Sequence, residues 1–151
     1  MNTPRFSKAL LLQACMRKQD QLISDFEHEI SHLQEAITQT EDTPSQEEER
    51  ASSQNELLVR LEHEVHFLKN ERIILELLEV EKICDRVELG AVVVTDQQVF
   101  FISTSVDVVS IEGLTFFGIS TKAPIYAVMK DKHALDTFDY AGVKYRILEL
   151  Y

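Results

Sequence analysis

Apolar residues recur at helical spacing over two long stretches of the chain, with charged residues between them. In each stretch they return every three, four or seven positions, and Gln19 fills the longest gap in the first. This spacing places them on one face of a helix and predicts the seam of a two-helix coiled coil. The first seam is Leu12, Cys15, Leu22, Phe26, Ile30, Leu33 and Ile37, and the second is Leu58, Leu61, Val65, Leu68, Leu75 and Leu78, with Arg72 at an expected apolar position.

An acidic segment separates the two stretches. Pro44 lies within it and cannot continue a helix, because its ring removes a backbone donor and clashes with the preceding turn. Helices joined by a short loop pack antiparallel, so we expect a helical hairpin with an acidic tip. Acids also suit the positive end of the second helix, which is a purely structural reason for them to be there. The tip acids are Glu41, Asp42, Glu47, Glu48 and Glu49.

The hydrophobic pattern changes at Val87, after a helix that we expect to end near Asp85. Short runs of β-branched and aromatic residues then alternate with polar turns, which predicts antiparallel strands in a meander. A short helix is expected over 123–129, because Pro124 suits a first helical turn. The strand-forming runs are 92–94, 99–102, 106–111, 114–119, 137–140 and 143–148, the last two joined through Ala141-Gly142.

The predicted fold class is therefore α+β. Residues 1–85 form an N-terminal coiled-coil hairpin, and residues 86–151 form a small antiparallel-sheet domain with a short helix. Of the net charge of -11, the first part carries 18 acids against 9 bases, and the second 8 against 6. Such acidity argues against direct binding of nucleic-acid phosphates, which need clustered Lys and Arg. We expect a basic protein surface or a metal ion as the counterpart.

Neither cysteines nor histidines form a recognisable ligand pattern. Cys15 and Cys84 match no metal spacing, and we expect free thiols in a reducing cytoplasm. The pairs His28/His32 and His63/His66 share helix faces but lack a third ligand. No phosphate loop, nucleophile elbow or zinc motif occurs, so we expect no active site of its own. The sequence also shows no apolar run long enough for a membrane span and no leader pattern, which favours a cytoplasmic protein.

The order of these parts resembles the bacterial Gre transcript-cleavage factors over essentially the whole chain. The resemblance is strongest in the second part. There, residues 119–125, Ile-Ser-Thr-Lys-Ala-Pro-Ile, align without a gap with the family's Ile-Ser-x-x-Ser-Pro-Ile. Residues 143–149 align with its closing strand.

The resemblance implies an FKBP-like second domain that docks on the rim of the secondary channel of RNA polymerase. The docking residues that it implies are Ser120, Lys122, Ala123, Pro124 and Ile125. The hairpin would enter the channel, where Asp42 and Glu41 would help to hold a shared Mg²⁺ in the polymerase active site. The chain would then be a monomer without a cofactor of its own, and it would meet nucleic acid only through the elongation complex.

The tip departs from the family pattern, Asp-Leu-Ser-Glu-Asn-Ala-Glu-Tyr. With Asp42 on the family's Asp, Ser45 stands where the family has Glu, Glu48 matches the later Glu, and Glu49 replaces Tyr. Glu41, Glu47 or Glu48 could substitute for the missing acid. Two modes therefore stay open, namely stimulation of transcript cleavage and modulation of the polymerase without cleavage.

Two hypotheses from other classes also stand. The chain could be a coiled-coil adaptor with no polymerase role, whose hairpin dimerises through the seam from Leu58 to Leu78. It could instead be a prolyl isomerase, as an FKBP-like fold suggests, although fold alone does not imply function.

Overall fold

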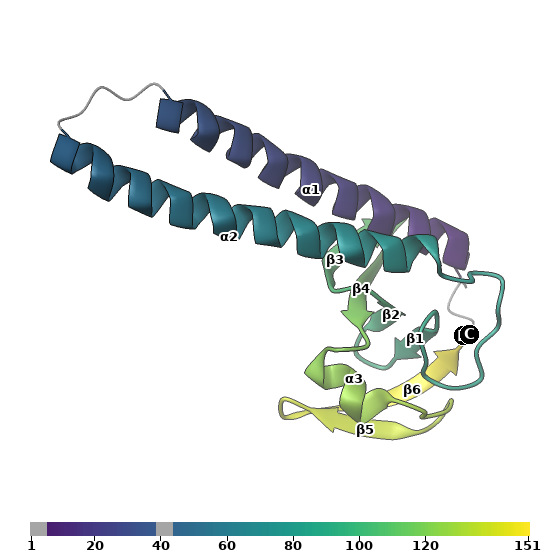
Figure 1. Cartoon of the computed structure of the whole chain (residues 1–151). Helices are drawn as coiled ribbons and strands as arrows, with labels where there is room; N and C mark the ends of the chain where they lie inside the picture. Colours follow the sequence, from purple (N-terminus) through teal and green to yellow (C-terminus); the bar gives the residue numbers. More distant parts are fainter. Residues whose placement is uncertain (1–5, 39–43) are drawn as a thin grey trace. The chain divides into compact units, whose positions relative to one another are not determined.

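The chain is an α+β protein in which two long N-terminal helices precede a six-stranded mixed sheet (Figure 1). The computed structural model describes residues 6–38 and 44–151, with side chains described from residue 48 onward in the second range. This confirms the predicted fold class at that level. The helices are α1 (Lys8–Thr38), α2 (Pro44–Glu76) and α3 (Pro124–Met129), and the strands are β1 (Val92–Thr95), β2 (Val99–Ser103), β3 (Val106–Ile111), β4 (Leu114–Ser120), β5 (Thr137–Tyr140) and β6 (Val143–Leu150).

The chain gathers into two compact units. One comprises Gln19–Arg72, and the other comprises Met1–Lys18 together with Ile73–Tyr151. Both long helices therefore contribute residues to both units. The predicted division into 1–85 and 86–151 stays a prediction.

The helix α2 ends at Glu76, so the expectation that it ends near Asp85 is wrong. The amides of the next two residues close the last turn, since Leu77 N donates to Ile73 O and Leu78 N donates to Leu75 O. Beyond this point the chain needs a different path, because Cys84 and Val87 are buried in the core of the sheet unit. Tertiary burial thus overrides a local pattern that still suits a helix.

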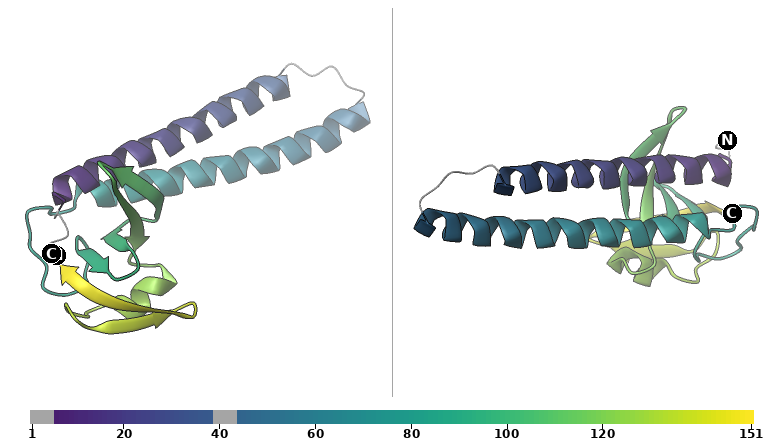
Figure 2. Two further views of the ribbon diagram at one scale, coloured as in Figure 1. Left: turned by 180° about the vertical axis from the view of Figure 1, so that it is seen from behind. Right: turned by 45° about the horizontal axis from the view of Figure 1, so that its top comes forward.

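In the unit Gln19–Arg72, α1 and α2 lie side by side (Figures 1 and 2). The predicted seam positions in this unit are buried or half-buried, and Val65 and Leu68 are the most buried of the apolar ones. Polar contacts accompany this seam. Gln19 Nε2 donates to Leu68 O at 2.9 Å, Arg72 Nε lies 2.9 Å from Asp20 Oδ1, and Lys69 Nζ lies 3.1 Å from Glu27 Oε1.

The sheet has the strand order β3-β4-β2-β1-β6-β5. The prediction of a wholly antiparallel sheet is wrong at one pair, because β2 and β4 run parallel. After β2 the chain passes to the edge as β3, and β4 returns between β3 and β2. Gly118 permits this close passage, since a Cβ there would lie 2.6 Å from Thr104 O and 3.0 Å from Val106 Cβ.

Both faces of this sheet are covered within the unit that holds it. On one face Phe100, Tyr145 and Ile147 pack with α3 and with Cys84 and Val87. On the other face Phe101 and Phe116 pack with the start of α1 and the last turn of α2, through residues that include Leu11, Cys15 and Leu75. This explains why residues 92–94 form an unbroken apolar run, because their neighbours alternate between two buried faces.

Local features of the sheet unit confirm several predictions. All four strand-forming runs before α3 form strands, and Pro124 begins α3. Ala141 and Gly142 join β5 to β6 with φ of 52° and 78°, as a tight hairpin turn requires. Cys15 and Cys84 are free and buried.

No helix in the described ranges is long and apolar enough to cross a membrane.

Candidate functional site

The acidic tip is described only in part. Glu41 and Asp42, the candidate magnesium ligands, lie outside the described residues, as does the side chain of Glu47. Glu48 and Glu49 are exposed on the early turns of α2, which begins at Pro44. Their position near a helix N-terminus is electrostatically favourable, and their carboxylates face solvent. The assignment of the tip as a metal-holding site stays a prediction.

The histidine pairs do not form metal sites in the part of the chain that is described. His28 and His32 are exposed on α1, and His63 and His66 are exposed on α2. Across residues 6–38 and 44–151, no three His, Cys, Asp or Glu side chains come together in a group that could hold a metal ion.

The predicted docking segment lies where β4 ends and α3 begins. Ser120 organises this turn, because its Oγ accepts from Lys122 N at 3.1 Å and its carbonyl accepts from Ala123 N at 3.0 Å. Lys122 and Pro124 are exposed, whereas Ile125 is only 8% exposed and belongs to the core. Ser120 and Ile125 therefore hold the local structure of this segment, whereas Lys122 and Pro124 are exposed to solvent.

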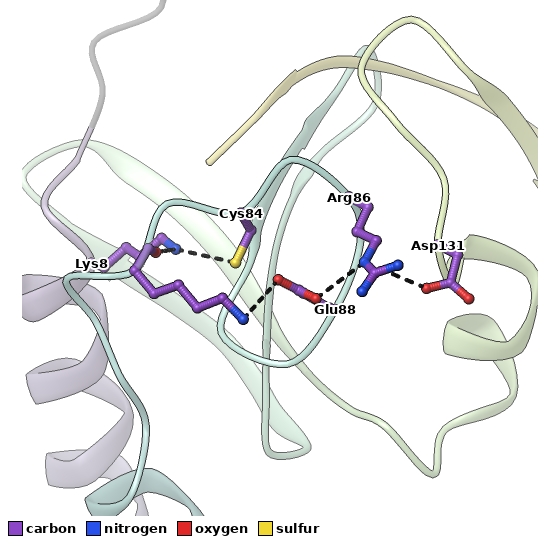
Figure 3. A network of polar contacts seen from close by, with 6 residues as sticks. Lys8, Cys84, Arg86, Glu88 and Asp131 are labelled. Atoms are coloured by element: carbon purple, nitrogen blue, oxygen red, sulfur yellow. Dashed lines mark hydrogen bonds and ion pairs between the residues drawn. The ribbon is translucent and has the colours of Figure 1, made fainter.

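A polar network that the sequence analysis did not foresee runs through the sheet unit (Figure 3). Lys8, only 7% exposed, donates from Nζ to Lys82 O at 2.7 Å and approaches Cys84 Sγ at 3.7 Å. Lys82 Nζ lies 3.2 Å from Glu88 Oε1, and Arg86 Nε lies 3.3 Å from Glu88 Oε2.

The network extends from Arg86 to the turn after α3. Arg86 Nε lies 4.0 Å from Asp131 Oδ1, and the backbones are joined by Asp131 N donating to Val87 O at 3.0 Å. Each carboxylate oxygen of Glu88 has a cationic partner, since Oε1 pairs with Lys82 and Oε2 pairs with Arg86. Figure 3 shows the contacts of Arg86 with Glu88 and with Asp131. The contacts fix a segment that has no regular secondary structure.

The charges of the network explain the shifts in proton affinity. The hydrogen bond from Lys82, followed by that from Arg86, lowers the pKa of Glu88. Burial lowers the pKa of Lys8 and raises the pKa of Cys84, while their mutual attraction opposes both shifts. A buried thiol that keeps its proton is a poor nucleophile. The arrangement therefore suits a structural role and not covalent catalysis.

A cleft of about 360 Å³ adjoins the network. Apolar side chains and charged side chains both line it, and two of the charged ones, Lys82 and Glu88, belong to the network. The full lining is Leu77, Leu78, Glu79, Lys82, Glu88 and Leu89. All of these residues come from the segment between α2 and β1.

Sequence reasoning missed Lys8 and Asp131 because their partners are distant in sequence, and it missed Arg86 and Glu88 because a close charged pair outside a helix or strand matches no motif. The one available signal was Lys8, a charged residue directly before the apolar run 9–12. Cys84 was noted only as a free thiol. Comparison of the chain with protein-family models, with curated proteins and with solved structures finds no match in any of the three.

Proposed function

We propose that this chain is a regulator of RNA polymerase of the Gre type. In this proposal residues 86–151 dock on the polymerase, and the hairpin of α1 and α2 enters the secondary channel with its acidic tip first. The observation that carries the proposal is the pair of long helices, of 31 and 33 residues, joined through five carboxylates in residues 41–49. An acidic connection between two long helices would suit a probe for a cationic or metal-containing site.

The contacts between the helices support an antiparallel coiled-coil hairpin. Asp20 pairs with Arg72, and Glu27, further along α1, pairs with Lys69, which lies earlier in α2. Residue numbers therefore rise on one helix as they fall on the other. Two paired helices resist bending better than one, and a probe that must reach into a channel benefits from this stiffness.

The sheet unit supports the docking role. The helix α3 packs on one face of the sheet through Ile125, Tyr126 and Met129, an arrangement in keeping with an FKBP-like domain of a sheet around a short helix. The exposed Lys122 and Pro124, on a turn held by Ser120, offer a rigid contact for the polymerase rim.

Asp42 and Glu41 would add carboxylate ligands to a magnesium ion in the polymerase active site. A second ion there would stabilise charge in a phosphoryl transfer that the polymerase itself performs. The chain would then have no active site of its own and would work in the cytoplasm as a monomer. Ser45, where the family has Glu, leaves both cleavage stimulation and modulation without cleavage within the proposal.

The test is RNA cleavage in backtracked elongation complexes built with the source organism's own polymerase, at low magnesium concentration. The variant Glu41→Gln/Asp42→Asn removes two tip carboxylates, and Glu62→Gln/Glu64→Gln removes two exposed ones on α2 as a matched control. Shortened transcripts that disappear only with the tip variant support cleavage stimulation.

The other outcomes separate the remaining hypotheses. If no shortening occurs but the chain displaces a known cleavage factor, it is a modulator that occupies the channel. If the chain neither shortens transcripts nor displaces that factor, the proposal fails.

A coiled-coil adaptor is the second candidate, because α2 exposes large apolar side chains. Leu57, Val59 and Phe67 are 41%, 51% and 48% exposed. Such residues outside the seam could serve another protein partner. Polymerase binding by the wild-type chain would decide against this candidate, and absence of such binding would favour it.

A further inference from the structure

The segment between α2 and β1 exposes large apolar side chains. Ile83 and Leu77 are 81% and 75% exposed, which makes them the most exposed large apolar residues among those described, and Leu89 is 45% exposed. Single exposed apolar residues are normal on protein surfaces, but several on one short segment indicate an interaction site. Leu77 and Leu89 both line the cleft of about 360 Å³.

The cleft combines apolar walls with a charged rim. Leu77, Leu78 and Leu89 supply the apolar part, and Glu79, Lys82 and Glu88 supply the charges. Protein interfaces share this anatomy, with an apolar centre that excludes water and a polar edge that directs orientation.

The segment is held in shape although it lacks regular secondary structure. Lys8 Nζ bonds to Lys82 O, the Lys82 side chain pairs with Glu88, and Val87 N donates to Lys132 O at 2.8 Å. Cys84 and Val87 anchor it in the core at 2% and 0% exposure. Leu77 and Ile83 are therefore exposed on a fixed surface, and a partner would not have to order it on binding.

The charge around the cleft is negative. Glu79, Glu81 and Asp85 are exposed and form no ion pair with the described residues, whereas Lys82 and Arg86 are both engaged with Glu88. A second acidic copy of this chain, at a net charge of -11, would be repelled from such a surface. The complementary partner carries an apolar side chain next to Lys or Arg.

We propose that the linker cleft, lined by Leu77, Leu78 and Leu89 with the acids around it, is a second docking site for RNA polymerase. It binds a polymerase segment that places an aliphatic or aromatic side chain beside a basic one. This inference rests on the proposed function. It adds a contact at the end of α2 that is separate from the tip acids and from the turn at Lys122 and Pro124.

The test is equilibrium binding of the full chain to immobilised core RNA polymerase of the source organism. Leu77→Ser/Leu89→Ser removes apolar side chains that line the cleft and are already exposed, so the fold should persist, as urea unfolding would verify. We expect the Kd to rise about tenfold or more, because apolar anchors at the centre of an interface dominate its affinity. Leu135→Ser/Leu148→Ser makes the same change at exposed residues elsewhere in the sheet unit, and its Kd should stay within about twofold of wild type.

A charge variant tests the second half of the inference. Glu79→Lys/Glu81→Lys should slow association at low salt, with the difference shrinking as salt is added, because electrostatic steering is screened. If wild-type affinity survives in both the apolar and the charge variant, the cleft is not a docking site and the proposed function stands.

Two other results would also overturn the inference. If the wild-type chain does not bind polymerase, the proposed function fails and the inference fails with it. If light scattering shows a wild-type dimer that Leu77→Ser/Leu89→Ser converts to a monomer, a second copy of the chain occupies the cleft.

Discussion

Replacing Gly118 by Ala should destabilise the sheet unit. The added Cβ would lie 2.6 Å from Thr104 O, 3.0 Å from Val106 Cβ and 3.2 Å from Val106 N. Two of these atoms belong to the backbone where the chain enters β3, so they cannot turn away as a flexible side chain could. Overpacking of this kind costs about 1–3 kcal/mol. The gain in strand propensity from Gly to Ala, about 0.5–1 kcal/mol, offsets only part of that cost.

Urea unfolding followed by tyrosine fluorescence measures this effect in the right unit, because all four tyrosines lie in residues 126–151. Gly113 provides the matched control, since it has a φ of +84° and open space around its Cβ position. Asn tolerates positive φ, so Gly113→Asn should stay close to wild type, whereas Gly118→Asn should be at least as harmful as Gly118→Ala. If the free energy of unfolding of Gly118→Ala lies within about 0.5 kcal/mol of the wild-type value, Gly118 does not lie as close to Thr104 and Val106 as the structure shows.

Three further predictions concern ionisable groups. Burial raises the pKa of Cys15 from 9.0 to about 11, so only the unfolded chain loses its thiol proton between these values. The unfolding free energy should therefore fall by up to about 2.7 kcal/mol as the pH rises through this window, and a Cys15→Ala variant measured in parallel should lack that part of the slope. The pKa of Glu88 is lowered, so stability should drop as the pH falls below about 4.5, and Glu88→Gln should reduce this drop in acid titrations. Lys8→Met removes the donor to Lys82 O, so hydrogen exchange across residues 79–87 should become about tenfold faster, whereas Lys18→Met, which removes a bond to Val108 O, should leave that segment unchanged.

Elements fixed by neighbouring residues could be predicted from the sequence. The β5–β6 hairpin follows from Ala141-Gly142, and α3 follows from Pro124, because turn chemistry and helix starts depend on one or two positions. The seam of the long helices follows from spacing alone. Gln19 illustrates this, since its place in the seam pattern predicts an inward position and its side chain is 1% exposed.

Features that depend on distant residues could not be predicted. The pattern of leucines and glutamates after Glu76 still suits a helix, but the burial of Cys84 and Val87 decides the path of the chain. The parallel pairing of β2 with β4 requires β3 to lie outside them, and no local pattern distinguishes this from a meander. The Lys8 contacts join residues more than 70 positions apart.

The sequence could suggest candidate site residues only where they are consecutive, and those suggestions stay predictions. The acids of 41–49 and the turn at 120–125 form continuous motifs that can be compared with a family pattern. Within the second motif, the family pattern does not distinguish core residues from surface residues. Their solvent exposure does, because Ile125 is buried in the core whereas Lys122 and Pro124 face solvent. The linker cleft has no such motif, since its residues alternate apolar and charged without a period.

The polar residues of the helical pair explain how its register is set. An apolar seam alone tolerates a shift of one heptad, because each leucine would meet another apolar residue. Such a shift would leave the buried Gln19 Nε2 without its acceptor, Leu68 O, and would separate Asp20 from Arg72. The apolar contacts of the shifted register would not compensate for these lost polar contacts. The polar contacts near Gln19 therefore select one register among those that the apolar seam alone would accept.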